Sequence, residues 1–309
     1  MNTATLQTNQ WWAYLQLMRP ANIVTAWADI VAGFAVSGAI LGLQNQDVSS
    51  VFVVIVPLGW LLLATTGLYG GGVVFNDVFD AELDAIERPE RPIPSDRVSR
   101  RAATLLGSAL LALGILAASQ SSGFSAAIAS IIAATALLYD AIAKHHPVFG
   151  PLTMGLCRGG NLLLGVSIIP AMVSDRWYLA LIPILYIAAI TAISRGEVEG
   201  GHTLTGITAL VLMAIVMSSL IVLGSLFNHQ LLAVLSFTAL LATQIIPPFI
   251  KATRNPLPEH IRAAVKAGVL SLIILDAAIA ASFAGLFPGL ATLLLLPLSI
   301  GLARIFSVT

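Results

Sequence analysis

Long apolar runs alternate with short polar breaks along the whole chain. Each run extends for about 18 to 24 residues, which is long enough for a helix to cross the hydrocarbon core of a bilayer. The ten runs that we identify lie at 22–43, 52–75, 102–119, 123–140, 151–172, 177–194, 204–226, 230–250, 265–286 and 288–306. They do not alternate apolar and polar residues as the strands of a membrane barrel do, so helices are the expected spanning structure.

The C-terminal end of this pattern has two interpretations. The last two runs are separated by little more than Phe287, Pro288 and Gly289. They form either two full spans or a ninth span followed by a terminal half-helix. The sequence therefore predicts an all-α, polytopic membrane bundle of nine or ten transmembrane helices.

Composition supports a single membrane domain. Hydrophobic residues make up 58% of the 309 residues and charged residues only 10%, whereas soluble domains carry about 25% charged residues. No linker or low-complexity segment divides the chain, so we expect one domain over 1–309 that starts with a polar and interfacial segment at 1–18. The net charge of zero gives no reason to expect a nucleic-acid partner, and the single cysteine, Cys157, excludes an intramolecular disulfide.

The positive charges indicate how the chain is oriented. When the loops are counted from the N-terminus, 14 of the 15 Lys and Arg residues fall on the side of the N-terminus and the even-numbered loops, and only Arg176 falls on the other. Loops rich in Lys and Arg remain in the cytoplasm. We therefore expect a multi-pass membrane protein whose N-terminus and site-bearing loops are cytoplasmic.

A dense acidic stretch follows the second apolar run directly. Its oxygen-bearing side chains are Asn76, Asp77, Asp80 and Asp84. If the stretch is helical, Asp80 lies about 60° and Asp84 about 20° from Asp77, so the three carboxylates share one face. Such oxygens suit Mg²⁺, and Arg88 and Arg91 follow within two turns, where their forked donors fit phosphate oxygens. The stretch predicts a site for a Mg²⁺–diphosphate group; the alternative is a solvated loop helix.

A second acidic stretch follows the sixth run. It reads Ser194-Arg195-Gly196-Glu197-Val198-Glu199 and falls on the same predicted side as the first. The two stretches can close on one metal–diphosphate group from opposite sides of the bundle. Glu197 and Glu199 are two residues apart, so they do not share a helical face, and a loop or helix end must redirect one of them. The alternative is an ordinary cytoplasmic turn.

Three further features carry candidate chemistry. Lys144 stands in the fourth loop, within reach of a phosphate, whereas the neighbouring pair His145 and His146 lacks further ligands at metal spacing and is expected to be solvated. Asp29 lies inside the first run, which marks either a functional group or a partner for a neighbouring helix. Close helix packing is expected at Gly67, Gly70, Gly71, Gly72, Gly155 and Gly159.

Three motifs resemble those of one known family. They are Arg19-Pro20-x-Asn22 followed by Thr25-Ala26, then Asn76-Asp77-x-x-Asp80-x-x-x-Asp84 with Arg91-Pro92-x-Pro94-Ser95, and Arg158-Gly159-Gly160-Asn161 within 151–165. On these motifs the chain resembles the UbiA superfamily of intramembrane prenyltransferases over most of its length. The N-terminal motif and Ser194-Arg195-Gly196-Glu197 are similar to the EboC branch of that superfamily.

The resemblance implies a helical bundle around a central cavity, and Mg²⁺-dependent transfer of an isoprenyl group from its diphosphate to a lipophilic or aromatic acceptor. The implied partners are a prenyl diphosphate, that acceptor and membrane lipid. The implied catalytic and metal-binding residues are Asn76, Asp77, Asp80, Asp84, Glu197 and Glu199. The implied substrate-binding residues are Asn22, Asn76, Arg88, Arg91, Lys144, Arg158, Asn161 and Arg195.

The chain departs from the family pattern in two places. Asp96 stands where a glycine is usual after Pro-Ser. Glu197 and Glu199 stand where the second motif typically carries aspartates. A glutamate has one more methylene to order when it binds a metal, so we expect the second metal ion to bind weakly.

The chemistry also fits the residues themselves. Ionising an allylic diphosphate requires metal and cationic side chains around the leaving group and a cavity that excludes water from the carbocation. Two readings from other classes stay open. One is a protein that binds or translocates a lipid-like molecule. The other is an ion-coupled transporter that uses Asp29 or Asp276 in mid-span, although the acidic residues gather at one face rather than at the midplane.

Overall fold

The computed structural model describes residues 10–40, 48–226 and 230–306, and within these ranges it is built of helices without strands. Residues 1–9 of the polar segment and the last three residues of the first predicted span lie outside these ranges. The N-terminal half contains α2 (Gln10–Met18), α3 (Pro20–Ser37), α4 (Val48–Phe79), α5 (Ala81–Glu87), α6 (Arg100–Ser119), α7 (Gly123–Ala141), η2 (Ala143–His145) and α8 (Phe149–Val166). The C-terminal half contains α9 (Pro170–Arg176), η3 (Trp177–Ala180), α10 (Leu181–Ser194), α11 (Thr203–Leu226), α12 (Leu231–Arg254), α13 (Pro258–Ala284), α14 (Leu286–Leu293) and α15 (Leu295–Ala303).

The number of spans follows from apolarity and length. Among the described residues, nine helical stretches are long and apolar enough to cross a membrane. The last of them, Leu286–Ala303, is divided between α14 and α15. Helix α8 is not in this set; it carries Arg158 and Asn161, and it nevertheless packs inside the bundle against α3, α7 and α10. The prediction of an all-α membrane bundle is confirmed.

Local sequence signals explain where several helices begin. Pro20 and Pro258 occupy first-turn positions of α3 and α13, where a missing backbone donor is harmless. The side chains of Ser99 and Ser122 accept hydrogen bonds from backbone amides of the first turns of α6 and α7, which satisfies otherwise unpaired donors.

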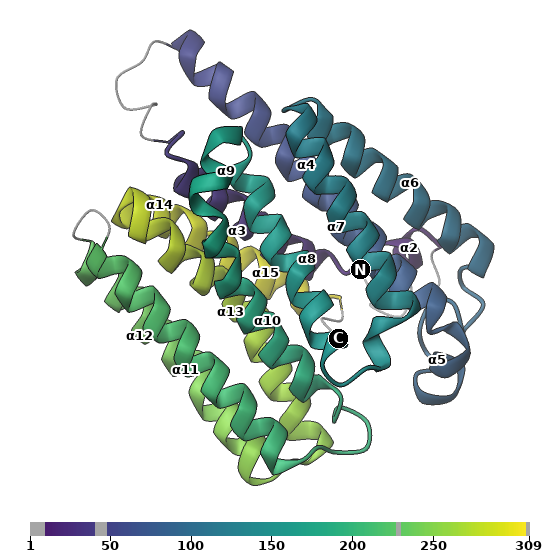
Figure 1. Ribbon diagram of the computed structural model, residues 1–309. Coiled ribbons are helices and arrows are strands. Elements are labelled where there is room, and N and C mark those ends of the chain that lie inside the picture. Colours follow the sequence, from purple (N-terminus) through teal and green to yellow (C-terminus); the bar gives the residue numbers. More distant parts are fainter. Residues whose placement is uncertain (1–9, 41–47, 227–229, 307–309) are drawn as a thin grey trace.

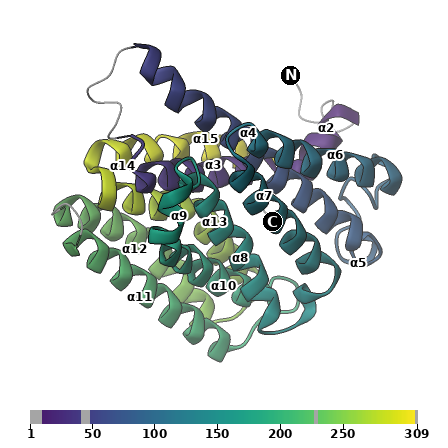
Figure 2. The ribbon, with the colours of Figure 1, turned by 45° about the horizontal axis from the view of Figure 1, so that its top comes forward.

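The bundle has two groups of helices with α3 and α8 between them (Figure 1). On one side α4, α6 and α7 enclose an apolar cluster, and on the other α10, α11, α12 and α13 enclose the largest one. Both views place α8 between α7 and α10 (Figure 2). The apolar stretches of α3 and α13 are 83% and 78% buried, against 28% for α7 and 28% for α12. Asp29 of α3, Arg158 and Asn161 of α8, and Asp276 of α13 accordingly lie in the interior of the bundle.

Glycines allow helices to approach closely at two of the predicted positions. An added Cβ at Gly67 would lie 2.4 Å from the Leu110 carbonyl oxygen of α6. One at Gly155 would lie 2.6 Å from the Ile184 carbonyl oxygen of α10. Both distances are far below van der Waals contact, so the packing role that the sequence predicts for these glycines is confirmed.

Gly67 and Gly59 make a matched pair for testing this packing, because both lie in α4 and an added Cβ at Gly59 would meet nothing within 4 Å. We expect Gly67→Ala to destabilise the protein by about 1–3 kcal/mol through overpacking. We expect Gly59→Ala to be neutral or stabilising, since alanine favours a helix by up to about 1 kcal/mol over glycine. Thermal unfolding in detergent measures both, and equal shifts for the two variants would contradict the close-packing interpretation.

Candidate functional site

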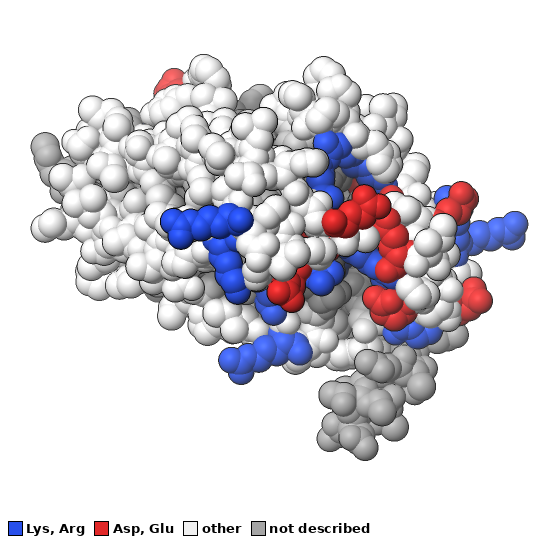
Figure 3. Space-filling view, turned by 90° about the horizontal axis from the view of Figure 1, so that it is seen from below, with Lys and Arg blue, Asp and Glu red and all other residues white. Residues whose placement is uncertain are grey.

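A cavity of about 570 Å³ opens among the ends of α4, α7, α8 and α10, with α5 and the loops before α3 and after α10 at its rim. Figure 3 views the molecule from this end, where Lys, Arg, Asp and Glu side chains gather. The walls further inside are apolar. They are formed by Leu68, Val73, Ile132, Ala136, Met154, Ile187, Ile190, Val265, Val269 and Leu272. The cavity therefore has a charged mouth and an apolar middle.

The first acidic stretch lies at the mouth, where α4 ends and α5 begins. Backbone hydrogen bonds from Asp80 to the Asn76 carbonyl (3.0 Å) and from Asp84 to the Asp80 carbonyl (2.8 Å) preserve helical spacing across the break. Asn76, Asp80 and Asp84 line the cavity. The prediction that Asp77 shares their face is wrong: Asp77 does not line the cavity, because its carboxylate is buried beside Arg19.

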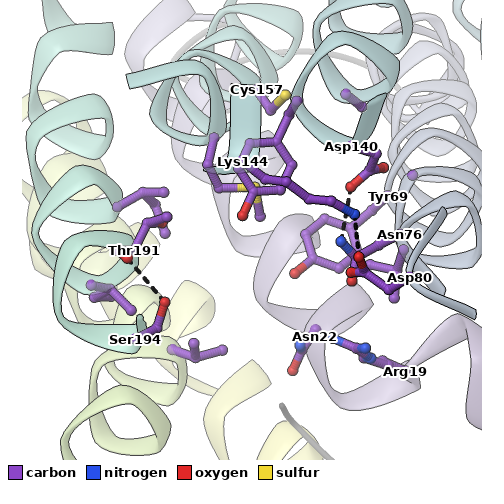
Figure 4. A pocket seen from close by; sticks show the side chains of 18 of the residues that line it. Arg19, Asn22, Tyr69, Asn76, Asp80, Asp140, Lys144, Cys157, Thr191 and Ser194 are labelled. Atoms are coloured by element: carbon purple, nitrogen blue, oxygen red, sulfur yellow. Dashed lines mark hydrogen bonds and ion pairs between the residues drawn. The ribbon is translucent and has the colours of Figure 1, made fainter. Parts of the chain in front are cut away.

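Cations from three segments neutralise these carboxylates. Arg91 Nη1 lies 2.7 Å from Asp84 Oδ2 and 3.2 Å from Asp77 Oδ1, so it bridges both. Arg19 Nη2 lies 2.8 Å from Asp77 Oδ1. Lys144, from η2, pairs with Asp80 (Figure 4). Each carboxylate of the stretch thus has a cationic partner at the mouth.

Sequence reasoning missed two residues of this mouth. Arg19 was noted only as part of a family motif; it has φ 48° and ψ 68°, a left-handed conformation that is unusual for a non-glycine residue, and it connects α2 to α3. Asp140 is buried, lines the cavity and accepts a hydrogen bond from Asn76 Nδ2 at 2.9 Å. An acidic residue at the end of an apolar run, one turn before Lys144, was the available signal.

The second acidic stretch reaches the cavity through one residue. Glu197 is buried and lines the mouth, where its Oε2 lies 3.4 Å from Arg88 Nη2. Arg262 donates to its backbone carbonyl at 3.2 Å. Glu199 is exposed and lies outside the cavity. The Arg88–Glu197 contact therefore joins the loop of the first motif to that of the second.

Arg195, which follows α10, and the histidine pair of the fourth loop have structural partners. Arg195 lines the cavity rim and donates to the backbone carbonyl of His145. The ring of His146 accepts from the backbone amides of Val148 and Phe149 at 3.2 and 3.1 Å. The described residues contain no group of three or more His, Cys, Asp or Glu side chains arranged to hold a metal ion. The histidine pair serves the turn that leads into α8.

The donor set at the mouth fits Mg²⁺ by its chemistry. Asn76, Asp80, Asp84 and Glu197 supply only oxygen ligands from both sides of the cavity, and Mg²⁺ prefers oxygen ligands. Among the described residues no three of the carboxylates converge while they are paired with their cations, so they must turn from those partners to bind one ion. The cations that now neutralise these groups are of the kind that binds phosphate oxygens. A Mg²⁺–diphosphate group carries both positive and negative charge. The metal can therefore replace the cation beside each carboxylate, and the phosphate oxygens can replace the carboxylate beside each cation.

Polar residues of α4 and α8 also line the inner part of the cavity; they are Thr65, Arg158 and Asn161. Asn22 of α3 lines the cavity one turn after Arg19. Thr65 of α4 precedes Asp80, which lies just past the end of α4, by 15 residues, an axial rise of about 22 Å at about 1.5 Å per residue. Asn161 accepts from Thr65 at 2.7 Å. All the substrate-binding residues that the sequence predicts line the same cavity.

Burial sets the electrostatics of the mouth. It raises the pKa of the Asp84 carboxyl, and the adjacent Arg91 guanidinium opposes that rise. It also raises the pKa of the Glu197 carboxyl, which Arg88 opposes most. Burial, helped by Arg19, lowers the pKa of Arg91. Keeping these carboxylates ionised therefore costs the folded protein stability, which is typical of groups that serve a ligand rather than the fold.

Comparison with known proteins finds one family. The model of the UbiA prenyltransferase family matches residues 30–246. The digeranylgeranylglyceryl phosphate synthase of Methanothrix thermoacetophila is 38% identical over 151 residues, which cover 49% of this chain and 52% of that enzyme. The synthase of Saccharolobus solfataricus is 31% identical over 190 residues, covering 61% and 62%. The matched segments thus span less than two thirds of these relatives.

Solved structures share the fold at low sequence identity. A UbiA homologue from Archaeoglobus fulgidus bound to GPP and Mg²⁺ aligns with a TM-score of 0.62 and 17% identity over 91% of this chain and 99% of that one. The apo UbiA homologue from Aeropyrum pernix K1 aligns with a TM-score of 0.60 and 18% identity over 82% and 96%. The helical arrangement is therefore common to these proteins.

The raised pKa of Glu197 makes a prediction about stability. The folded-state pKa lies above the unfolded value, so the parent is most stable below the unfolded pKa of about 4.3 and loses stability as pH rises through the folded pKa. Glu197→Gln keeps the shape and removes the charge. We expect it to melt above the parent at neutral pH in metal-free detergent, with a difference that shrinks as pH falls.

Glu90→Gln is the control, because Glu90 is exposed at the same end of the molecule, and its melting curve should follow the parent. A Glu197→Gln variant that melts below the parent at every pH would show that the Arg88 contact outweighs burial.

Proposed function

The chain belongs to the UbiA prenyltransferase family, and on this premise we propose that it is a Mg²⁺-dependent membrane prenyltransferase. It moves an isoprenyl group from its diphosphate to a lipophilic acceptor. One observation carries the proposal: a mouth lined by paired carboxylates and cations opens directly into an apolar cavity. Such a cavity matches a substrate with a charged head and an apolar tail.

We assign the diphosphate head to the mouth. Asn76, Asp80, Asp84 and Glu197 would hold Mg²⁺, which when bound neutralises the leaving group. Arg88, Arg91 and Lys144 would turn from their carboxylates to the phosphate oxygens; Arg195 would complete this positive rim. Asp77, which is paired with Arg19 and Arg91, would orient those two guanidiniums from behind.

The remaining residues account for the chemistry of transfer. The bond between the isoprenyl carbon and the diphosphate oxygen breaks, and the apolar walls protect the resulting allylic cation from water. A bond to the acceptor forms, and the acceptor's proton must leave. We assign its removal to Asp140, which lines the cavity between Asn76 and Lys144.

We further propose that the mouth faces the cytoplasm. The reason is that 14 of the 15 Lys and Arg residues fall on the same predicted side of the membrane as the loops that form the mouth, and loops rich in Lys and Arg remain in the cytoplasm. In a Cys157→Ala background, a cysteine at the exposed residue Ser95 should react with an impermeant maleimide only from the cytoplasmic side. A cysteine at the exposed residue Gln120, at the other end of α6, should react only from the opposite side. The reverse pattern would contradict the proposed orientation.

Asp80→Asn tests the donor site. The variant removes a charge at the mouth without changing shape, so we expect at least a tenfold loss of Mg²⁺-dependent prenyl diphosphate binding, or about 1.4 kcal/mol. Calorimetric titration in detergent measures it, with thermal unfolding as a check on folding. Asp175→Asn, at an exposed residue of α9, is the matched control. Undiminished binding in Asp80→Asn would mean that this face does not hold the diphosphate.

Glu197→Gln tests the second loop, which has one carboxylate at the cavity. We expect pyrophosphate release to require more Mg²⁺ than substrate binding does. The variant should lower turnover at least tenfold, about 1.4 kcal/mol of barrier, and spare much of the binding, because the first motif still holds one ion. Titrating turnover and binding separately against Mg²⁺ checks this. If turnover and binding in the parent depend on Mg²⁺ in the same way, and the variant is unaffected, the second loop has no role in metal binding and is only a turn.

The exposed position of Glu199 favours one alternative, a protein that binds or translocates a lipid-like molecule without transferring it. That reading predicts tight prenyl diphosphate binding with no pyrophosphate release for any acceptor. The same titrations therefore separate the two functions.

A further inference from the structure

A second buried polar cluster adjoins the inner end of the cavity, away from the mouth. It contains two carboxylic acids from different helices, Asp29 of α3 and Asp276 of α13, each with 0% exposure. Arg158 of α8, 5% exposed, is their cationic neighbour. The mechanism assigned to the mouth uses neither acid.

The two acids are satisfied unequally. Asp29 Oδ2 lies 2.7 Å from Arg158 Nε and accepts a hydrogen bond from Asn161 at 2.8 Å. Asp29 Oδ1 and both oxygens of Asp276 receive no donor from the described residues. The Asp276 carboxyl stands within hydrogen-bonding range of Asp29. Two carboxyl groups therefore face each other with three acceptor oxygens and no donor between them.

Charge balance requires a proton at this contact. Two carboxylates and one guanidinium leave one net negative charge in the interior of the membrane bundle, where an uncompensated charge is costly. The charged or titratable side chains that interact with Asp276 are Asp29, Arg158 and Tyr186, and the Tyr186 hydroxyl donates to the Gly268 carbonyl at 2.8 Å. Two acids in hydrogen-bonding range hold one proton between them, since both cannot remain ionised there.

A shared proton makes the whole cluster neutral, and this determines what the cavity offers at its inner end. Arg158 lines the cavity, its Nη2 has no acceptor among the described residues, and its guanidinium lies 5.7 Å from the centre of the Tyr69 ring. Its charge is already compensated by Asp29. The guanidinium can therefore donate a hydrogen bond to a ligand that carries no negative charge.

We propose that Asp29 and Asp276 share one proton, and that Arg158, the member of this cluster that lines the cavity, is thereby a neutral hydrogen-bonding subsite. The subsite receives an uncharged oxygen of the acceptor, a hydroxyl or carbonyl, and excludes a carboxylate or phosphate. The assignment of this ligand to the acceptor rests on the proposed prenyl transfer; the shared proton does not.

The apolar middle of the cavity separates this subsite from the diphosphate site. Thr65 of α4, which donates to Asn161, precedes Asp80 by 15 residues, an axial rise of about 22 Å, and Asp80 lies just past the end of α4. A prenyl tail directed at the inner end would leave Arg158 Nη2 without an acceptor, which is unfavourable for a buried polar group. An acceptor held by a neutral oxygen at the inner end satisfies this nitrogen and presents its reacting atom toward the mouth.

The shared proton is tested by infrared spectroscopy of the purified protein at neutral pH. The parent should show the carbonyl band of a protonated carboxylic acid, and this band should disappear in Asp276→Asn. Asp175→Asn, which changes an exposed carboxylate, should leave it unchanged. If Asp276→Asn removes no such band, the acid pair is not protonated and the inference is wrong.

The charge selectivity is tested by calorimetric binding of two matched probes, benzyl alcohol and benzoate, which differ only in their oxygen-bearing group. We expect the parent to bind the neutral probe at least tenfold more tightly. Asp276→Asn, which is neutral without a shared proton, should keep that preference. The double variant Asp29→Asn/Asp276→Asn leaves Arg158 uncompensated and should reverse it. A parent that prefers the carboxylate, binds both probes equally or binds neither would overturn the subsite.

Neither test depends on the proposed reaction. Both the infrared band and the probe titrations are measured without prenyl diphosphate or Mg²⁺. A protein that never releases pyrophosphate, yet shows the band and the neutral preference, would refute the transferase proposal and retain the subsite. A protein that releases pyrophosphate but lacks the band would support the transferase proposal and refute the shared proton.

Discussion

The cost of placing charge inside a membrane protein organises this structure. Every acidic residue of the first motif that is buried or lines the cavity has a cationic partner, and those partners come from distant parts of the chain: Arg19, Arg91 and Lys144. The same constraint acts deeper, where Asp29 holds Arg158. It also explains why α8, the least apolar of the long helices inside the bundle, lies between α3, α7 and α10 rather than at the lipid-facing surface. Pairing therefore fixes both the position of the helices and the location of the site.

Pairing at the mouth also prepares the site for its ligand. A site of isolated carboxylates would repel a diphosphate, and one of isolated cations would not retain a metal ion. The Asp80–Lys144 and Asp84–Arg91 pairs keep both kinds of group near the cavity at no net charge. A Mg²⁺–diphosphate group brings the same two kinds of charge, so the exchange of partners changes the local charge little. The raised pKa of Asp84 and Glu197 indicates that folding alone does not favour these carboxylates.

The sequence predicted the helices well because apolar runs and their polar breaks are local properties. It also placed Asn76, Asp80 and Asp84 correctly, since helical spacing continues through the α4–α5 break. It did not separate Asp77 from them, because the direction of that side chain depends on Arg19, which is far away in sequence and has a left-handed backbone. Nothing in the sequence distinguishes Glu197 from Glu199. The folded loop buries Glu197 and leaves Glu199 exposed. The contact between Asp29 and Asp276 joins helices that are almost 250 residues apart in the chain, and no local pattern reveals it.

The central claim is that the paired charges at the cavity mouth are a metal–diphosphate site. A crystal structure with Mn²⁺ in place of Mg²⁺ and an unreactive prenyl diphosphate analogue tests it most directly, because the anomalous scattering of Mn²⁺ locates the ion. The account predicts an Mn²⁺ peak beside Asp80 and Asp84, with Lys144 and Arg91 turned from these carboxylates to the phosphate oxygens. An ion bound elsewhere, or a diphosphate bound with the Asp80–Lys144 and Asp84–Arg91 pairs intact, would contradict it.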